Sequence, residues 1–236
     1  MKTATKHRLQ NCDPDDISDA LVAVQRSFGI EYASDAFKGV KTFGELCDVV
    51  VASVRREHRE GCTAQQAFYK LRRSITSVLR GDATSESVGL TVPIKPTTRL
   101  DELFPGRGRK GKIQEVQWLL GTKLELLEMT SRVGWGLLGG YLLGFLTIFI
   151  NWRIGVAVLV GVAMINWFAL QFGNKFVCAT VGDASRLFMR DHYQRARRDP
   201  DTVNNEEIVP VIKAIFVQQL ALEPEVLARD EELKWQ

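Results

Sequence analysis

The chain contains few of the residue patterns from which chemical sites are usually built. Its four cysteines, Cys12, Cys47, Cys62 and Cys178, form no CxxC pair, so paired thiolates give no metal site. This pattern and the absence of an N-terminal signal peptide predict reduced thiols in a cytosolic setting. The segment GRGRKGK lacks the Ser or Thr that ends a phosphate-binding loop. We therefore expect no metal and no cofactor.

An excess of basic residues is also lacking. The formal net charge of the 236 residues is only +3. No basic stretch is interleaved with aromatic residues that could stack on bases, which nucleic-acid-binding surfaces commonly require. These observations argue against nucleic acid as a partner.

Charge is almost absent from residues 133–173, where Arg153 is the only charged side chain. The uncharged run 133–150 would extend roughly 27 Å as a helix, close to the thickness of a bilayer's hydrocarbon core. A second apolar run, 154–173, follows after the short turn NWR. The two runs predict a transmembrane helical hairpin over 133–173.

The charges that flank this hairpin predict its orientation. The turn between the two runs carries Arg153 as its only charged residue. Basic residues lie on both outer sides of the hairpin: Arg107, Arg109, Lys110, Lys112, Lys123 and Arg132 before it, and Lys175, Arg186 and Arg190 after it. By the positive-inside rule, we expect a multi-pass membrane protein with two spans and both termini in the cytoplasm. The basic stretch 107–112 makes membrane lipid an expected partner. The row Gly136, Gly140 and Gly144 predicts close helix contact, either within the hairpin or between two copies.

Amphipathic patterns predict further helices on both sides of the hairpin. Residues 15–28 carry an apolar stripe formed by Ile17, Ala20, Leu21, Val24 and Phe28. Thr42 and Glu45 have the spacing of a capping box, as do the ends of TAQQ at 63–66, and Thr180 and Asp183 repeat the pattern. Other helices are expected over 113–129 and 206–222. We therefore predict five segments: a helical domain 13–80, a linker 81–112 with a basic stretch, a juxtamembrane helix 113–132, the hairpin 133–173, and C-terminal cytoplasmic helices 174–236.

The phrase FGIEY, followed by VKTFGELCDVV, resembles the acyl carrier protein family over roughly residues 13–54. In that family a recognition helix ends in a similar phrase, and a Thr-x-Gly-Asp/Glu-Leu helix follows after a loop. The C-terminal segment IVPVIKAIFVQQLALEPEVLARDEEL looks like the first helix and loop of a carrier. The resemblance implies an all-α fold, with a small acyl-carrier-like helical bundle beside the transmembrane hairpin. It also raises the hypothesis that both ends of the chain complete one four-helix bundle.

The resemblance lacks the residue on which carriers depend. In family register, Pro14 follows Asp13 where the family has its modified serine, and proline has no hydroxyl to carry a phosphopantetheine arm. The resemblance then implies a membrane-anchored docking module without its own arm. Two alternatives stay open: a true carrier modified at Ser18 or Ser185, and a membrane scaffold or regulator whose likeness to carriers is only helical patterning.

An acidic cluster is the candidate partner-binding surface. Asp15, Asp16 and Asp19 stand at a predicted helix start, where carboxylates interact favourably with the helix dipole. Because the acidic recognition helix of the family docks basic enzymes, the resemblance implies that these three residues and Glu31 bind a protein partner. The oligomeric state stays open.

Catalytic residues do not emerge from the sequence. His58 and Cys62 are four positions apart and would share one face of a continuous helix. Gly61 and the new cap at Thr63 predict that no helix runs through this point, so we interpret the pair as a surface coincidence. We therefore expect that the protein is not an enzyme.

Overall fold

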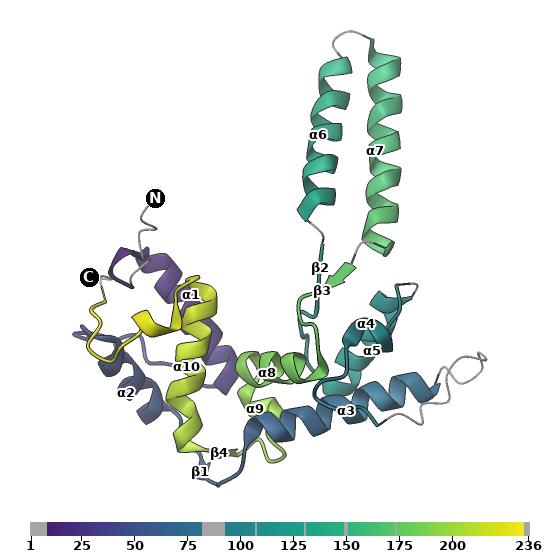
Figure 1. Cartoon of the computed structure of the whole chain (residues 1–236). Coiled ribbons are helices and arrows are strands. Elements are labelled where there is room, and N and C mark those ends of the chain that lie inside the picture. Colours follow the sequence, from purple (N-terminus) through teal and green to yellow (C-terminus); the bar gives the residue numbers. More distant parts are fainter. Residues whose placement is uncertain are drawn as a thin grey trace, which may run out of the picture. The chain divides into compact units, whose positions relative to one another are not determined.

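The computed structural model describes residues 9–81, 93–106, 108–129, 131–148, 151–172 and 174–233. These residues form ten α-helices, two 3-10 turns and four short β-strands (Figure 1). The chain divides into two compact units, unit 1 with Met1–Lys70 and Ser185–Gln236, and unit 2 with Leu71–Ala184. The protein is mostly helical, but the strands depart from the predicted all-α class.

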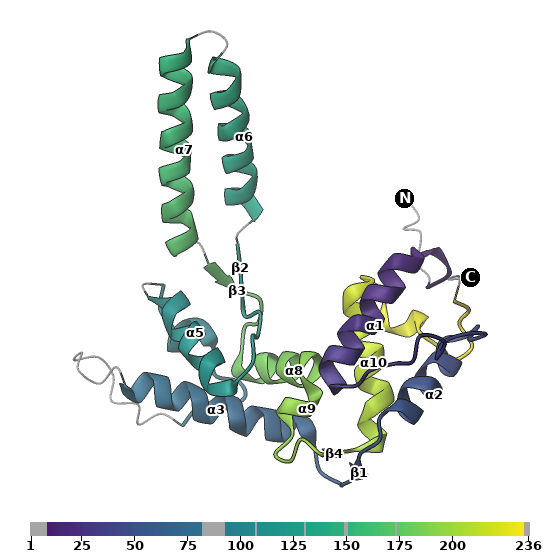
Figure 2. The ribbon, with the colours of Figure 1, turned by 180° about the vertical axis from the view of Figure 1, so that it is seen from behind.

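Unit 1 contains one hydrophobic core built from both ends of the chain. Its main helices are α1 (Pro14–Phe28), α2 (Phe43–Ser53) and α10 (Asn205–Gln219). Helices α1 and α10 lie side by side in Figures 1 and 2. Buried apolar residues of the three helices belong to the same core cluster; among them are Ile17, Val24, Phe28, Phe43, Leu46, Val50, Ile208, Ile212 and Phe216. Both ends of the chain thus contribute to one core, as the bundle hypothesis requires. The four-helix bundle itself stays a prediction.

Local capping explains where α1 and α2 begin and end. The side chain of Asp13 accepts a hydrogen bond from the Asp15 N–H at 3.1 Å, and Pro14 occupies the first turn of α1, where its missing N–H costs nothing. Gly29 ends α1 in the left-handed conformation, with φ of 58°. At α2, Thr42 and Glu45 form the predicted capping box. The predicted Thr42–Glu45 box is confirmed.

Shorter elements complete unit 1. They are the 3-10 turn η1 (Leu9–Asn11), the strands β1 (Glu57–His58) and β4 (Thr202–Val203), the helix α9 (Tyr193–Ala196), and the 3-10 turn η2 (Pro224–Val226). Strands β1 and β4 pair in parallel, with Glu57 opposite Thr202. Two helices, α3 (Thr63–Gly81) and α8 (Val181–Asp191), cross the boundary between the units in sequence. Helix α8 begins at the predicted cap, where Thr180 and Asp183 exchange hydrogen bonds.

Unit 2 contains buried apolar residues and a helical hairpin. Its elements are α4 (Leu100–Leu103), α5 (Arg109–Leu120), β2 (Leu127–Met129), α6 (Ser131–Ile148), α7 (Trp152–Phe172) and β3 (Asn174–Phe176). Strands β2 and β3 pair antiparallel, with Leu127 opposite Phe176. The predicted helix over 113–129 instead ends at Leu120, because Gly121 takes a φ of 66° and the chain then enters β2.

Helices α6 and α7 form the predicted hairpin and lie side by side (Figures 1 and 2). A Cβ on Gly140 would stand 2.9 Å from the side chain of Val162, and one on Gly144 would stand 2.6 Å from that of Leu159. These two glycines therefore let the paired helices approach closely. The structure places no atom within 4 Å of a Cβ built on Gly136.

The transmembrane prediction is wrong. In the part of the chain that the structure describes, no helix combines the length and the apolar character that crossing a membrane requires. Helix α6 has 18 residues, and Arg132 and several glycines dilute its hydrophobicity. This finding overturns the two-span hairpin, the membrane localisation and the cytoplasmic placement of the termini. Lipid contact at 107–112 stays an untested prediction, and Arg107 lies outside the described residues.

The predicted domain ranges divide the chain differently from the two compact units. They stay predictions. Residues 82–92 of the predicted linker lie outside the described residues. The remainder of the predicted linker, 81–112, includes helix α4 and the first turn of α5.

Candidate functional site

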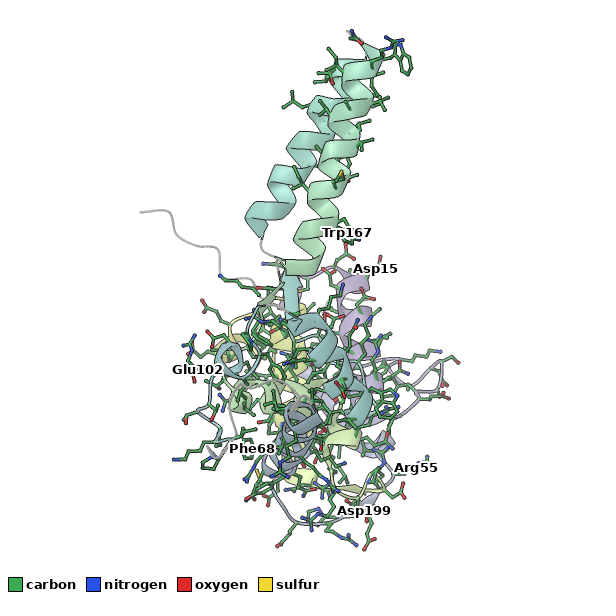
Figure 3. The ribbon with its side chains drawn as sticks, turned by 90° about the vertical axis from the view of Figure 1, so that its right-hand side faces the viewer. Asp15, Arg55, Phe68, Glu102, Trp167 and Asp199 are labelled. Atoms are coloured by element: carbon green, nitrogen blue, oxygen red, sulfur yellow. The ribbon has the colours of Figure 1, made fainter. Side chains whose placement is uncertain are left out.

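The exposed face of α1 is the candidate functional site. On the side opposite the core, Asp15, Asp19, Val22 and Arg26 recur at spacings of three and four residues, so they lie along one helix face. Asp16 is exposed beside them. Figure 3 shows Asp15 at the surface of the protein. The structure thus brings three of the four predicted partner-binding residues together.

The charges of this face follow the polarity of the helix. The three carboxylates occupy the first turns of α1, and Arg26 lies in the last turn. This order complements the helix dipole, and each charge contributes roughly 0.3–1 kcal/mol at an exposed site. The dipole accounts for the charges but not for Val22, whose side chain is 47 % exposed in the middle of the face.

A hollow of about 480 Å³ lies at the C-terminal end of α1. It is lined by Val22, Gln25, Arg26, Ile30, Glu31 and Tyr32. Glu31, the fourth predicted residue, is therefore at the hollow and not in the acidic cluster. A helix of this length separates its two ends by roughly 20 Å. The face combines an acidic end with a partly apolar hollow.

Tyr32 lines the hollow and carries an unused hydrogen-bond donor. Its ring packs edge-on against Phe37, with 4.8 Å between ring centroids. Burial raises the pKa of the Tyr32 phenol, so its hydroxyl stays protonated at neutral pH. This hydroxyl is buried and has no hydrogen-bond partner among the described residues. Sequence reasoning missed Tyr32, because a single tyrosine in the loop EYASD carries no spacing signal.

The loop that shapes the hollow is held in place behind α1. The carbonyl oxygen of Gly29 accepts a hydrogen bond from Arg56 Nη2 at 3.1 Å, and the Ile30 N–H donates to the Gln25 carbonyl at 3.1 Å. A Cβ on Gly29 would collide with the side chain of Gln194. The positive φ of 58° favours glycine at this position, whereas the end of the Gln194 side chain could move aside. These contacts order the backbone that carries Ile30 and Tyr32.

The structure weighs against covalent carriage of an acyl arm. Pro14 occupies the first residue of α1, as the sequence register implied. The Ser18 hydroxyl donates to the Pro14 carbonyl at 3.0 Å, one turn inside the helix. Ser185 is only 5 % exposed on α8. Neither serine stands at a helix start as the family's modified serine does.

A second polar cluster surrounds Arg197, which is 1 % exposed. Its Nε donates to Thr202 Oγ1 at 3.1 Å, its Nη1 to Thr63 Oγ1 at 2.8 Å, and its Nη2 to the Arg59 carbonyl at 2.9 Å. Every guanidinium nitrogen thus has an acceptor, as a buried cation requires. Sequence reasoning missed the cluster.

Glu207 supplies the opposite charge for this cluster. Its Oε2 accepts from the Tyr193 hydroxyl at 2.8 Å and lies 3.9 Å from Arg197 Nη1, while its Oε1 accepts from the Thr63 N–H at 2.9 Å. Burial raises the pKa of Tyr193, which keeps its hydroxyl available as a donor. Because these groups bind one another, we assign the cluster a structural role in joining α3, α9 and α10.

The cluster also replaces the capping box predicted for TAQQ. The Thr63 hydroxyl interacts with Arg197 and Tyr193, and Gln66 Oε1 accepts from the Arg198 N–H at 2.6 Å. The predicted cap is therefore wrong, since both of its side chains are used in tertiary contacts.

His58 and Cys62 do not form a catalytic pair. His58 lies in β1, where its Nδ1 accepts from the Asn205 N–H at 3.3 Å. Cys62 is exposed at the residue before α3. No continuous helix joins them, as the sequence predicted.

The comparisons with known proteins give no relative: no family model, curated protein or solved structure matches the chain. The resemblance to acyl carrier proteins therefore has no support from a known relative. The membrane description was already contradicted by the helices themselves. The observations that remain for function are those of unit 1 itself.

Proposed function

We propose that unit 1 is a protein-docking module that binds a basic partner through the exposed face of α1. The observation that carries this proposal is the combination, on one helix, of three exposed carboxylates with an exposed valine and an adjoining hollow. Helix capping alone explains the first feature but not the other two.

The partner's chemistry follows from the two ends of the face. Basic side chains would lie opposite Asp15, Asp16 and Asp19, where exposed charge pairs mainly increase the association rate and select the partner. An apolar side chain of the partner would occupy the hollow and contact Val22. A carbonyl or carboxylate oxygen beside it would accept a hydrogen bond from the Tyr32 hydroxyl. Desolvated anchors of this kind contribute most of the affinity of an interface.

A peptide selection tests the proposal with the full chain as the target. Displayed peptides selected for binding should be rich in Lys and Arg and should contain a large apolar residue. The variant Asp15→Lys/Asp16→Lys/Asp19→Lys should bind them at least about tenfold more weakly. This loss corresponds to a few exposed charge pairs at the edge of the interface.

The matched control moves the same charge elsewhere in unit 1. The variant Glu57→Lys/Glu60→Lys/Glu225→Lys changes three exposed carboxylates outside α1 and should keep the affinity of the unchanged protein. Tyr32→Phe should weaken binding without changing the fold, because it removes only the hydroxyl. Equal binding by both lysine variants would contradict the proposal.

A further inference from the structure

The C-terminal strap, defined here as residues 227–233, closes the core of unit 1. Leu227 is 3 % exposed and Leu233 is 8 % exposed, and both belong to the core cluster. The strap therefore supplies part of the core from a segment at the edge of the described chain.

Backbone hydrogen bonds attach the strap to the beginning of α2. The Phe43 N–H donates to the Glu231 carbonyl at 2.9 Å, and the Gly44 N–H donates to the Arg229 carbonyl at 2.7 Å. The Leu233 N–H donates to the Lys41 carbonyl at 2.8 Å. The strap thus satisfies two of the N–H groups that every helix start leaves without an intrahelical acceptor.

Side chains give the strap a defined register. Arg229 Nη2 donates to both carboxylate oxygens of Asp48 at 2.7 Å. A Cβ on Gly44 would stand 2.7 Å from the Arg229 carbonyl oxygen, so the strap approaches α2 too closely for any other residue. Gly44 and Asp48 of α2 therefore both fit the backbone and the side chain of Arg229 in the strap.

The connection between α10 and the strap contains a strained residue. Ala221 has a φ of 49° and is the only non-glycine residue with positive φ in the described ranges. It follows the end of α10, where the Leu222 N–H returns to the Val217 carbonyl at 3.0 Å, a geometry that favours glycine. Alanine in this conformation destabilises the closed connection.

We propose that the strap exchanges between two copies of the chain, so that each strap docks on α2 of the other copy. The strap's contacts with α2 are the same in both arrangements, because a second copy supplies an identical segment. Opening the connection also lets Ala221 leave its strained conformation and extend α10 toward Pro224. Strained connections beside a terminal segment favour such exchange. The resulting dimer would carry two α1 faces, which increases binding to a partner with two sites.

A charge swap distinguishes exchange from other association. In the Asp48→Arg variant, Arg229 of the strap faces the introduced arginine. In the Arg229→Glu variant, the introduced glutamate faces Asp48. Neither variant therefore has a pair of opposite charges within one chain. In a mixed dimer with exchanged straps, the introduced arginine would face the introduced glutamate in one groove. In the other groove, the native Asp48 of one chain would face the native Arg229 of the other. Both grooves regain a matched pair only in this dimer.

The two variants would carry different affinity tags, and mixed pairs would be counted after co-purification. We expect mixed pairs about tenfold above those formed between two tagged copies of the unchanged chain, from two restored charge pairs. The double variant Asp48→Arg/Arg229→Glu restores the pair within one chain, so its two tagged copies should match the unchanged reference and confirm folding. Mixed pairs at the reference level would overturn the proposal. This outcome would also be expected if a peptide of another protein, and not the strap of a second copy, replaced the strap on α2.

Ala221→Gly provides a second measurement in the otherwise unchanged chain. Glycine relieves the strain of the closed connection and disfavours the extended helix, so the dimer fraction should fall on the order of fivefold. An unchanged or increased dimer fraction would contradict exchange through this connection.

Discussion

Helix α1 and the α6–α7 hairpin are both rich in apolar residues, but they differ in how far these residues are buried. In α1, Val24 and Phe28 are fully buried. In α6, Leu142 is 64 % exposed and Phe145 is 60 % exposed. Apart from the exposed Val22, the large apolar residues of α1 form one stripe, whereas those of α6 surround the helix. A one-sided pattern specifies which face is buried, and an all-round pattern specifies none.

The largest expected difference between the two regions comes from removing an aromatic ring. Phe216 is fully buried in unit 1, and its ring lies 5.3 Å from that of Phe43. Phe216→Ala should lower the free energy of unfolding by about 3–5 kcal/mol through the cavity it leaves. Leu143→Ala, at a side chain 62 % exposed in α6, should change it by less than about 0.5 kcal/mol. Urea unfolding followed by circular dichroism measures both, and equal losses would break the comparison.

Two arginines sharpen the comparison for charged groups. Arg197→Met should destabilise unit 1 by about 3 kcal/mol, because Glu207 would keep a partly buried charge without its cation. Arg153→Met removes an exposed guanidinium that lies 5.8 Å from the Trp152 ring, and it should cost less than about 1 kcal/mol. Thermal unfolding of the two variants gives the ranking. A smaller effect at Arg197 than at Arg153 would refute the structural role of the cluster.

Two glycines in helices test packing against helix propensity. Gly44→Ala should destabilise by about 2 kcal/mol, because the new Cβ would displace the strap from α2. Gly139→Ala, in α6, has no atom within 4 Å of the added carbon and should stabilise by up to about 1 kcal/mol. Denaturation midpoints of the two variants should move in opposite directions. Stabilisation by both would show that the strap does not approach Gly44.

The smallest effect concerns the thiol of Cys47. Burial, the main cause, raises its pKa from 9.0 to about 11. A raised pKa favours the neutral thiol in the folded state, so this stabilisation is complete below pH 9 and is lost as the pH rises toward 11. The stability advantage of the unchanged chain over Cys47→Ala should therefore shrink by about 1 kcal/mol between pH 8 and pH 10.5. Thermal unfolding at the two pH values measures this change; a constant advantage would place the thiol in solvent.

The sequence predicted features that depend on neighbouring residues. The apolar stripe of α1 over residues 15–28 required only a local pattern. The same holds for the Thr42–Glu45 box. Binary patterning also indicated a helix at the position of α10, and the family resemblance suggested that the two ends of the chain pack together.

The features that the sequence did not predict depend on residues far apart in the chain. Arg197 and Thr63 are 134 positions apart, and no local spacing connects them. The strap lies on α2 from the other end of the chain, and the strands β1 and β4 are two residues each. The α1 face was identified in part, since its acidic residues are adjacent, while Tyr32 and the hollow depend on the folded loop.

The hairpin error has a different origin. The near-absence of charge over 133–173, where Arg153 is the only charged side chain, was a correct observation. A low charge content does not by itself make a helix long and apolar enough to cross a membrane. Glycines interrupt the apolar surface of α6, and its 18 residues include Arg132. Charge alone was therefore an inadequate criterion.

Hydrogen–deuterium exchange of the full chain most directly tests whether both ends form one core. Phe216→Ala changes only α10, but in a shared core it should increase amide exchange in α1 and α2 about as much as in α10. Exchange in α6 and α7 should not change. Increased exchange confined to α10, with α1 and α2 as protected as in the unchanged protein, would contradict the shared core.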